Sequence, residues 1–457
     1  MTKIARVGLM VLTLLMASSS LTLSASAQTA SGTPLCRPSV TRSPNSPESH
    51  AYEIAPPLAN YVSEEYFVTC NVDGVPYTTI VQVRRPVVTS HASGIAIAEV
   101  WHWFGGWASY ARAGAYMARK NYTMIFMAAN PSAVAKIKAA DPKRYARLSL
   151  PWTPADLSSV SALKGPQEYE IYTQVGALIK SGGIPGLRVR KMIMAGMSVS
   201  AGQVRRYIEQ EAKTAKVNGK NIYDGYFPSQ TSVQFADKPI PDLDVPVVEV
   251  WGETELIRSF IQQGGHGTAY RRPDGPLYRL YEVAGMSHLD SGPTATEYWV
   301  GMRETPPTYD CNIPLVSNFP SPEIYGAALD SLVNWVDKGL PAPHAPRIET
   351  NADGSVIYRD EYGNAKGGIR TSVLDVPTAT INVLSRPPGD AGPGTHQCFH
   401  IGSLKLLSNA QLLKLYPNHA VYEHKVNAAL DRLVAGHWYL PEDARVAREE
   451  ARVAPIP

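Results

Sequence analysis

Short apolar runs separated by helix-like spacing fill the middle of the chain. Five runs have the length and composition of buried strands, and they span residues 94–100, 123–129, 189–195, 245–251 and 278–283. Between them, apolar residues recur every three or four positions, as on the buried face of a helix, over 108–120, 168–180 and 202–213. Strands that alternate with helices predict a mostly parallel sheet covered by helices on both faces, an α/β fold.

The pattern before and after this central part is different. Residues 66–85 alternate apolar and polar positions around Asp73-Gly74, which predicts a β-hairpin. Residues 325–338 have the spacing of an amphipathic helix, and Gly339 follows as a stop signal.

The C-terminal third has a looser pattern. Residues 341–400 are rich in Pro, Gly and Asp and predict irregular structure. Further helices are predicted over 409–415, over 420–435 and from Leu440 onward. We expect one α/β domain over 51–457, in which 130–166 form a cap over the active site and 341–457 form an elaboration packed on the core.

The N-terminus has the features of a secretory signal peptide. Lys3 and Arg6 precede an apolar run over 7–16, and a small-x-small site ends at Ala27. The run is about half the length needed to span a bilayer, which disfavours the alternative of a membrane anchor. We expect residues 1–27 to be removed, 28–50 to form an extended leader, and the mature protein to be exported, either periplasmic or secreted, without a membrane span.

Composition narrows the class of partner. Of the 457 residues, 44% are hydrophobic and 18% are charged, which is typical of a globular protein and not of a disordered one. The formal net charge of +3 is too small to predict nucleic acid or an anionic membrane as a partner. Oligomeric state stays open.

The chain contains an even set of cysteines: Cys36, Cys70, Cys311 and Cys398. In an exported protein such a set predicts two disulfides, and the paired spacing of a zinc site is missing. Three connectivities are possible. We favour Cys36–Cys70 with Cys311–Cys398, because each bridge then lies within one end of the chain.

The main chemical motif follows the third apolar run. Gly196-Met-Ser198-Val-Ser200 joins that run to a helical pattern, the setting of a nucleophile elbow, in which a strained turn lifts a serine hydroxyl above the sheet. Gly196 and Ser200 are the small residues that such a turn needs. A shifted frame would make Ser200 the nucleophile, but it lacks glycine at the tight position.

A serine hydroxyl needs a base and an acid, and both follow in the order expected for this fold. The run over 245–251 leads to Glu253 and Glu255, and the run over 278–283 leads to His288. We expect His288 to be the base and Glu255 the acid, with Glu253 as the alternative. Aspartates 242 and 244 precede their strand and so lie at its wrong end.

The tetrahedral intermediate also needs preorganised N–H donors. One should be the backbone N–H of Val199, and the other should come from His102 or Trp103 in the glycine-containing loop after the first apolar run. Tryptophans 101, 103 and 107 either line a substrate pocket or belong to the core. No His/Asp cluster accompanies His102, so neither a metal site nor a cofactor is predicted.

Several long stretches resemble the secreted bacterial "alpha/beta hydrolase domain" family, whose substrates are largely unassigned. The resemblance covers about residue 50 to the C-terminus, and its stretches are AEVWHWFGG, DPKRYARLSLP, YEIYTQVGALIKS, the elbow, VPVVEVWGETE, YRLYEVAGMSHLD, AALDSLVNWVDKG, RDEYGNAKGGIRT and YLPEDA. It implies an α/β-hydrolase fold with catalytic Ser198 and His288. Similar members have Asp where this chain has Glu255, and Gly where it has Ala201.

These observations predict an exported serine hydrolase that acts on a small-molecule carboxylic ester through an acyl-enzyme on Ser198. Haloalkane and epoxide chemistry on this fold would need a carboxylate at the elbow, which Ser198 replaces. Two alternatives stay open: a non-catalytic secreted binding protein on the same fold, and a lyase or acyltransferase that uses the same nucleophile. The sequence does not identify the substrate.

Overall fold

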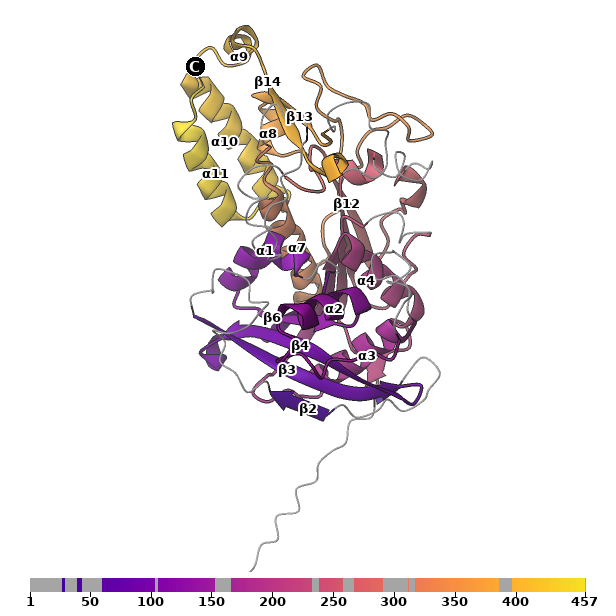
Figure 1. Ribbon diagram of the computed structural model, residues 1–457. Coiled ribbons are helices and arrows are strands. Elements are labelled where there is room, and N and C mark those ends of the chain that lie inside the picture. Colours follow the sequence, from indigo (N-terminus) through magenta and orange to yellow (C-terminus); the bar gives the residue numbers. More distant parts are fainter. Residues whose placement is uncertain are drawn as a thin grey trace, which may run out of the picture.

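The computed structural model describes residues 27–28, 39–42, 60–102, 106–152, 166–231, 238–257, 267–290, 311, 317–385 and 397–456. A nine-stranded sheet forms its centre (Figure 1). Its strands are β2 (Ser39–Arg42), β3 (Tyr61–Val72), β4 (Val75–Pro86), β5 (Ile95–Val100), β6 (Thr123–Ala128), β7 (Lys191–Met197), β10 (Gly225–Ser229), β11 (Val247–Gly252) and β12 (Tyr278–Val283). The order across the sheet is β12-β11-β10-β7-β5-β6-β4-β3-β2.

The sheet is parallel from β12 to β6 and antiparallel beyond. Every residue of β5, β6, β11 and β12 is buried, which explains why these strands read as short apolar runs. The five predicted strands are all present, and β7 and β11 each begin two residues later than predicted. Sequence analysis did not predict β10, because its sequence, Gly-Tyr-Phe-Pro-Ser, is short and contains the glycine, proline and serine that are typical of turns.

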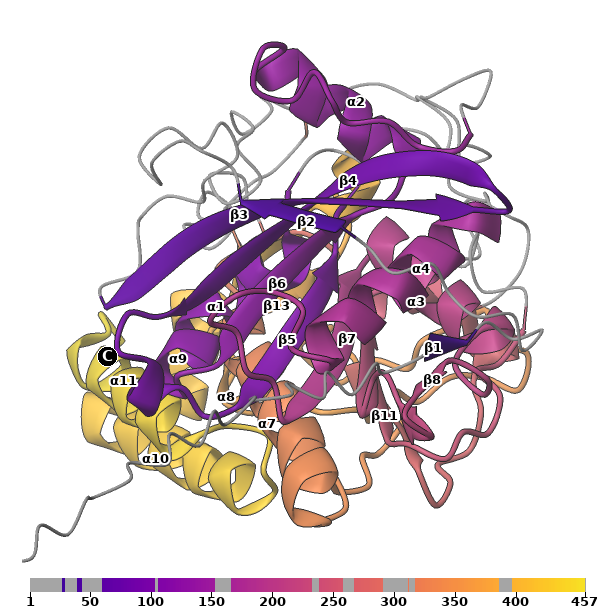
Figure 2. The ribbon, with the colours of Figure 1, turned by 90° about the horizontal axis from the view of Figure 1, so that it is seen from below.

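Helices cover both faces of the sheet (Figures 1 and 2). On one face lie α1 (Ala108–Arg119) and α7 (Ser321–Lys338), and on the other lie α3 (Pro166–Lys180) and α4 (Val199–Gln210). A buried carboxylate ties α1 to the sheet, because Glu99 of β5 accepts the N–H groups of Ser109 and Tyr110 over 2.6 and 2.9 Å. These contacts fix the entry of α1 over the centre of the sheet.

The predicted hairpin is confirmed by β3 and β4. The two strands pair along their full length and join through Asp73 and Gly74, whose φ angles are 50° and 80°. Two positive φ values are what a two-residue turn of type I′ requires. Figure 2 shows this long hairpin crossing one end of the sheet. A separate small sheet contains β1 (Ala27–Gln28), β8 (Lys216–Val217) and β9 (Lys220–Asn221).

The C-terminal part begins with an extended segment that covers the edge strand β12. Ile369 donates its N–H to the Glu282 carbonyl over 2.7 Å, and the N–H of Ala284 returns to Ile369 over 3.1 Å. Gly368 has a φ of 68°, and a Cβ there would lie 2.8 Å from the Glu282 carbonyl oxygen, so only glycine fits this crossing. The segment protects an edge that is otherwise open to pairing.

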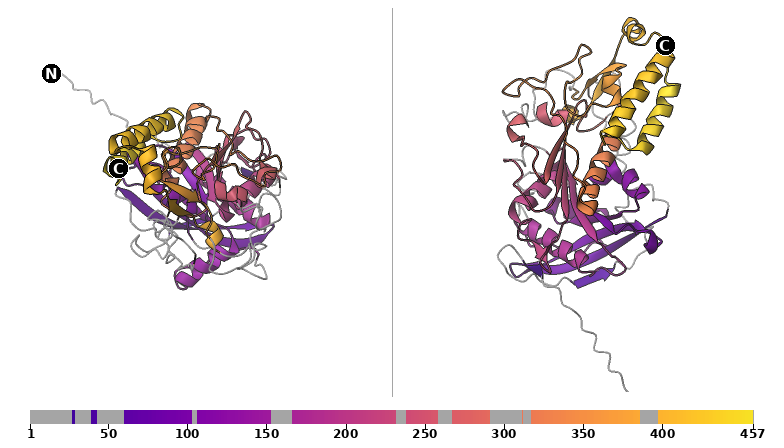
Figure 3. Two further views of the ribbon diagram at one scale, coloured as in Figure 1. Left: turned by 90° about the horizontal axis from the view of Figure 1, so that it is seen from above. Right: turned by 180° about the vertical axis from the view of Figure 1, so that it is seen from behind.

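Short elements and a helical pair complete the chain. They are α2 (Pro131–Ala140), α8 (Ser372–Asp375), β13 (Ala379–Asn382), β14 (Ser403–Leu406), α9 (Asn409–Leu415), α10 (His419–Ala435) and α11 (Pro441–Val453), with 3₁₀ turns at Thr89–His91, Gly267–Tyr270 and Gln397–His400. Figure 3 shows α10 and α11 side by side at the opposite end of the molecule from the β3–β4 hairpin. Within the described ranges, no helix is both long and apolar enough to cross a membrane.

Candidate active site

Ser198 occupies a sharp turn between β7 and α4. Its backbone has φ 58° and ψ −121°, a conformation that costs a non-glycine residue about 1–3 kcal/mol and persists only where its surroundings impose it. Gly196 makes the turn possible, because a Cβ at that position would lie 2.5 Å from the Ser200 carbonyl oxygen. The turn therefore has the strand–turn–helix geometry of a nucleophile elbow.

Ser200, the alternative nucleophile, is part of the turn itself. Its side chain is fully buried. The hydroxyl donates to the Met197 carbonyl over 2.8 Å and accepts from the Met197 N–H over 3.0 Å. These two bonds close the elbow, which explains why serine serves at a position where glycine is commoner.

Glu255 and His288 meet at the same edge of the sheet. Glu255 lies three residues after β11 and His288 five residues after β12, and the Oε1 atom of the glutamate is 2.7 Å from Nδ1 of the imidazole. Only 3% of the Glu255 side chain and 6% of the His288 side chain are exposed. A carboxylate held at Nδ1 fixes the tautomer and directs Nε2 away from the acid.

Glu253, the alternative acid, has different partners. Its Oε2 accepts the N–H of Gly285 over 2.8 Å, and its Oε1 lies 2.6 Å from Arg359. Glu255 instead uses its second oxygen to accept the Gly252 N–H over 2.8 Å. The sequence left the two glutamates open, and in the structure only Glu255 contacts the histidine.

The strand that the sequence missed joins the serine to the histidine loop. The N–H of Ser198 donates to the carbonyl of Ser229, the last residue of β10, over 2.9 Å. The next residue, Gln230, has a φ of 45° and donates from its side chain to the Ser287 carbonyl over 2.8 Å. Because β10 lies between β7 and β11, Gln230 connects the elbow side of the site to the turn that carries His288.

The predicted oxyanion donors differ in whether their N–H groups are already bonded. Val199 is the first residue of α4, and the first N–H groups of a helix have no acceptor within it. The N–H of His102, however, donates to the Gly106 carbonyl over 3.0 Å, so this donor is already used within its own loop. Trp103 lies outside the described residues.

The imidazole of His102 is buried. Burial lowers the pKa of His102 to about 3, and electrostatic coupling to His288 and Lys136 acts in the same direction. His102 is therefore neutral at ordinary pH. Of the three tryptophans in this part of the sequence, Trp101 and Trp107 belong to the core: the Trp107 ring stacks 4.0 Å from that of Phe126, and Trp101 is fully buried.

A buried ion pair braces the histidine loop from the side of α1. Arg112 pairs with Asp290, and both side chains are almost completely buried. The same guanidinium donates to the carbonyl of His288 over 3.1 Å. Sequence reasoning missed both residues, although Asp290 stands two positions after His288 and Arg112 is a charge on the apolar face of a helix.

One family model covers most of the chain. It describes an alpha/beta hydrolase domain and matches residues 50–449.

The chain belongs to this alpha/beta hydrolase domain family.

The match confirms the family resemblance of the sequence, and with the strand order it confirms the predicted fold class.

Three solved structures similar to this hydrolase have low sequence identity to it. Esterase Est22 shares 11% identity over 43% of this chain, with a TM-score of 0.27, and the chain spans 64% of its length. A putative dienelactone hydrolase from Klebsiella pneumoniae shares 14% over 42% of this chain and 73% of its own, with a TM-score of 0.27. A glucuronoyl esterase from Caldicellulosiruptor kristjansonii shares 13% over 44% of this chain and 46% of its own, with a TM-score of 0.27. No curated protein matches the chain.

The cysteines of the hydrolase are consistent with the predicted pairing. Cys311 and Cys398 form a disulfide with a Cα–Cα distance of 5.6 Å, as predicted. Cys70 is also disulfide-bonded, and Cys36 lies outside the described residues. The predicted signal peptide up to residue 26 and residues 153–165 of the predicted cap lie outside them too. Within the part of the chain that the structure describes, no group of three His, Cys, Asp or Glu residues is placed to hold a metal ion.

Proposed function

We propose that this alpha/beta hydrolase is an exported serine esterase that cleaves a small-molecule carboxylic ester through an acyl-enzyme on Ser198. The observation that carries the proposal is the buried contact of 2.7 Å between Glu255 and His288, at the sheet edge where Ser198 occupies a strained elbow. A buried acid that orients an imidazole, together with a serine on a nucleophile elbow, is the set of groups that activates a hydroxyl for acyl transfer.

In the first half of the reaction, Ser198 Oγ forms a bond to the ester carbonyl carbon while its proton passes to Nε2 of His288. The tetrahedral intermediate collapses, the bond to the alkoxy oxygen breaks, and the imidazolium returns the proton to that oxygen, so that an alcohol leaves. Glu255 stays ionised and stabilises the imidazolium. We assign the oxyanion contacts to the N–H groups of Val199 and Trp103.

In the second half, water takes the place of the alcohol. His288 removes a proton from the water as its oxygen bonds to the acyl carbon, and then returns that proton to Ser198 Oγ as the acyl–oxygen bond breaks. The products are the carboxylic acid and the free enzyme. An acceptor other than water would give an acyltransferase with the same first half.

Two further features support export. The disulfide between Cys311 and Cys398, together with the disulfide-bonded Cys70, fits an oxidising compartment. The N-terminal sequence has the basic start, the short apolar run and the small-x-small site of a signal peptide. Mass spectrometry of the N-terminus of the exported protein would test the expected cleavage after Ala27.

Turnover of short-chain p-nitrophenyl esters tests the proposed activity. The mature wild type should release p-nitrophenol, and Ser198→Ala should lose this activity while keeping its melting temperature, because the change removes one oxygen atom. The exposed Ser355 supplies a matched control, Ser355→Ala, which should behave as the wild type. A folded wild type that neither turns over an ester nor reacts with a fluorophosphonate would contradict the proposal and favour a binding protein.

A further inference from the structure

A segment from the C-terminal part runs along the loop that carries His288. This strap, residues 397–402, contains the 3₁₀ turn Gln397–His400. The N–H of Leu289 donates to the His400 carbonyl over 2.7 Å, and the N–H of Gly402 donates to the Leu289 carbonyl over 3.0 Å. Both backbone groups of Leu289, the residue directly after His288, are therefore bonded to the strap. Together they form a short parallel bridge between Leu289 and Ile401.

The strap also places a ring against the candidate base. The ring centroids of His400 and His288 are 5.1 Å apart, with an angle of 60° between the planes. His400 is 9% exposed, so its ring is held in the interior and does not move freely on the surface. The contact is within the range of tilted ring pairs that attract each other.

Gly402 shows how closely the strap approaches. A Cβ at this position would overlap Ser287 Oγ and lie 3.0 Å from Ser287 Cβ. Ser287 is fully buried, so its side chain has little room to move away. Only glycine allows the strap to lie against the residue that precedes His288.

The strap is anchored at both ends. Cys398 is fully buried and bonded to Cys311, which lies 87 residues earlier in the chain. Beyond Gly402 the chain continues into β14, which pairs with β13 along its whole length. The carbonyl of Val383, the residue directly after β13, accepts a hydrogen bond from the hydroxyl of Thr254 over 3.0 Å. Thr254 lies between the two glutamates. The disulfide and the hairpin together fix where His400 lies.

We propose that His400 is a positioning residue for His288, and that the Cys311–Cys398 disulfide holds it in place. This inference rests on the proposed function. Glu255 restrains one nitrogen of the His288 imidazole. The His400 ring packs against the same imidazole and limits its tilt, which keeps Nε2 in the orientation that the proposed mechanism needs. A displacement of about 1 Å at a reacting group is enough to lower a rate about 100-fold.

Kinetics of ring variants test the positioning role. His400→Ala should lower kcat for a p-nitrophenyl ester about 10- to 100-fold, with KM and the melting temperature close to those of the wild type. His400→Phe keeps a ring against His288 and should restore most of kcat. The matched control is His424→Ala, an exposed histidine of α10. An unchanged kcat in His400→Ala, or a loss that His400→Phe does not restore, would overturn the proposal.

Variants of the two anchors test the tether. The double variant Cys311→Ala/Cys398→Ala should lower kcat in the same way, because the strap then loses its upstream anchor. Gly402→Ala should lower it too, whereas Gly275→Ala, where a Cβ would meet only the end of the Arg272 side chain at 3.4 Å, should not. Wild-type kcat in a folded Cys311→Ala/Cys398→Ala protein would show that the disulfide has no part in positioning.

A spectroscopic readout separates this inference from the proposed function. In the mature protein with ¹⁵N-labelled histidine rings, the Nδ1 proton of His288 should give a low-field NMR resonance, assigned by its loss in His288→Ala. His400→Ala should shift or broaden it, and His400→Phe should retain it. If the resonance responds in this way but no ester is turned over, the positioning stands and the proposed function fails. If esters are turned over but His400→Ala leaves the resonance unchanged, or the wild type lacks it, the positioning fails.

Discussion

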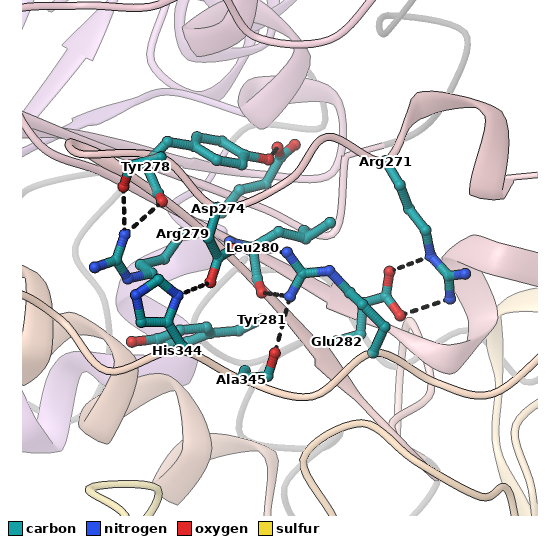
Figure 4. Close-up of polar contacts among 12 residues, drawn as sticks. Arg271, Asp274, Tyr278, Arg279, Leu280, Tyr281, Glu282, His344 and Ala345 are labelled. Carbon is teal, nitrogen blue, oxygen red and sulfur yellow. Dashed lines mark hydrogen bonds and ion pairs between the residues drawn. The ribbon is translucent and has the colours of Figure 1, made fainter.

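Within the described residues, two histidine–carboxylate pairs have almost the same length. His288 Nδ1 lies 2.7 Å from Glu255, and His344 Nδ1 lies 2.8 Å from Asp274. The first pair follows the carboxyl ends of β11 and β12. In the second pair, Asp274 precedes the amino end of β12 and His344 comes from the C-terminal part of the chain. Figure 4 shows the second pair, with His344 beside Asp274 close to Arg279. A short contact between an imidazole and a carboxylate therefore does not identify a catalytic pair.

Burial and neighbours separate the two pairs. The His344 side chain is 69% exposed, against 6% for His288. Burial acts to raise the pKa of Asp274, but hydrogen bonds from Arg347 and the Leu280 N–H, with the charge of Arg347 and a bond from His344, outweigh it and hold the pKa below its usual value. The main partner of Asp274 is thus Arg347, and His344 is a minor one. Together with the pair between Arg271 and Glu282 (Figure 4), this contact fixes the extended C-terminal segment to the sheet.

Removing the two histidines should give the largest contrast. His288→Ala should lower kcat/KM for an ester by about 10⁴-fold or more, since the loss of the base disables the whole catalytic set. His344→Ala should leave kcat/KM within about twofold of the wild type, because an exposed pair contributes little. Steady-state kinetics of the two variants, prepared in parallel, would decide this. Equal losses in both would end the distinction between the pairs.

Removing the charge of the two acids should give a smaller contrast. Glu255→Gln should lower kcat about 10²- to 10⁴-fold, because the amide no longer stabilises the imidazolium. Asp274→Asn should leave kcat unchanged and lower the free energy of unfolding by about 1–2 kcal/mol through the weakened bonds to Arg347. Glu253→Gln should resemble Asp274→Asn. A catalytic loss in Glu253→Gln as deep as that in Glu255→Gln would contradict the assignment of the acid.

The arginines beside the two pairs should differ in their effect on stability. Arg112→Met leaves Asp290 buried without its cation and should lower the free energy of unfolding by about 3–5 kcal/mol. Arg347 is 25% exposed, and Arg347→Met should cost about 1 kcal/mol. Urea unfolding at neutral pH measures both. A cost for Arg112→Met no larger than that for Arg347→Met would show that the ion pair behind His288 does not brace the loop.

Another buried carboxylate, Glu168, should produce a pH effect on stability, the smallest of these changes. Burial raises the pKa of Glu168 from 4.5 to about 8, against hydrogen bonds from Tyr172 and Gln203. Between these values the folded protein binds a proton that the unfolded chain has lost. This contribution to stability is full below about pH 4.5 and disappears as the pH rises through about 8.

Glu168→Gln should remove this dependence. Between about pH 6 and about pH 8.5, the variant should lose roughly 1–3 kcal/mol less of its free energy of unfolding than the wild type does. Urea unfolding at the two pH values measures the difference. Parallel curves for the two proteins would show that Glu168 ionises in the folded state as it does in the unfolded chain.

Much of the fold was predictable from the sequence because buried parallel strands are continuous apolar runs. The elbow, the histidine turn and the C-terminal disulfide followed from local motifs and cysteine count. β10 was not predictable, since it is short, contains Pro228, and has the small residues Gly225 and Ser229 at its ends. Gln230 was missed with it. The choice between Glu253 and Glu255 depends on which side of a short turn faces the histidine, and only tertiary structure fixes that.

His400 had no sequence signal beyond its position two residues after Cys398. It lies in a region that the sequence describes only as irregular, and its contact with His288 spans more than a hundred positions of the chain. The His102 N–H shows the opposite case, in which a plausible donor is consumed by a loop bond to Gly106. Both depend on long-range or loop geometry, which apolar patterns do not encode.

The most direct test of the account is the site of covalent modification by a fluorophosphonate. The mature wild type, His344→Ala and His288→Ala would each be treated with the probe, digested and mapped by mass spectrometry. The account predicts one phosphonyl group on the peptide that contains Ser198 in the wild type and in His344→Ala, and strongly slowed labelling in His288→Ala. No adduct in the folded wild type, or an adduct on a different serine, would contradict it.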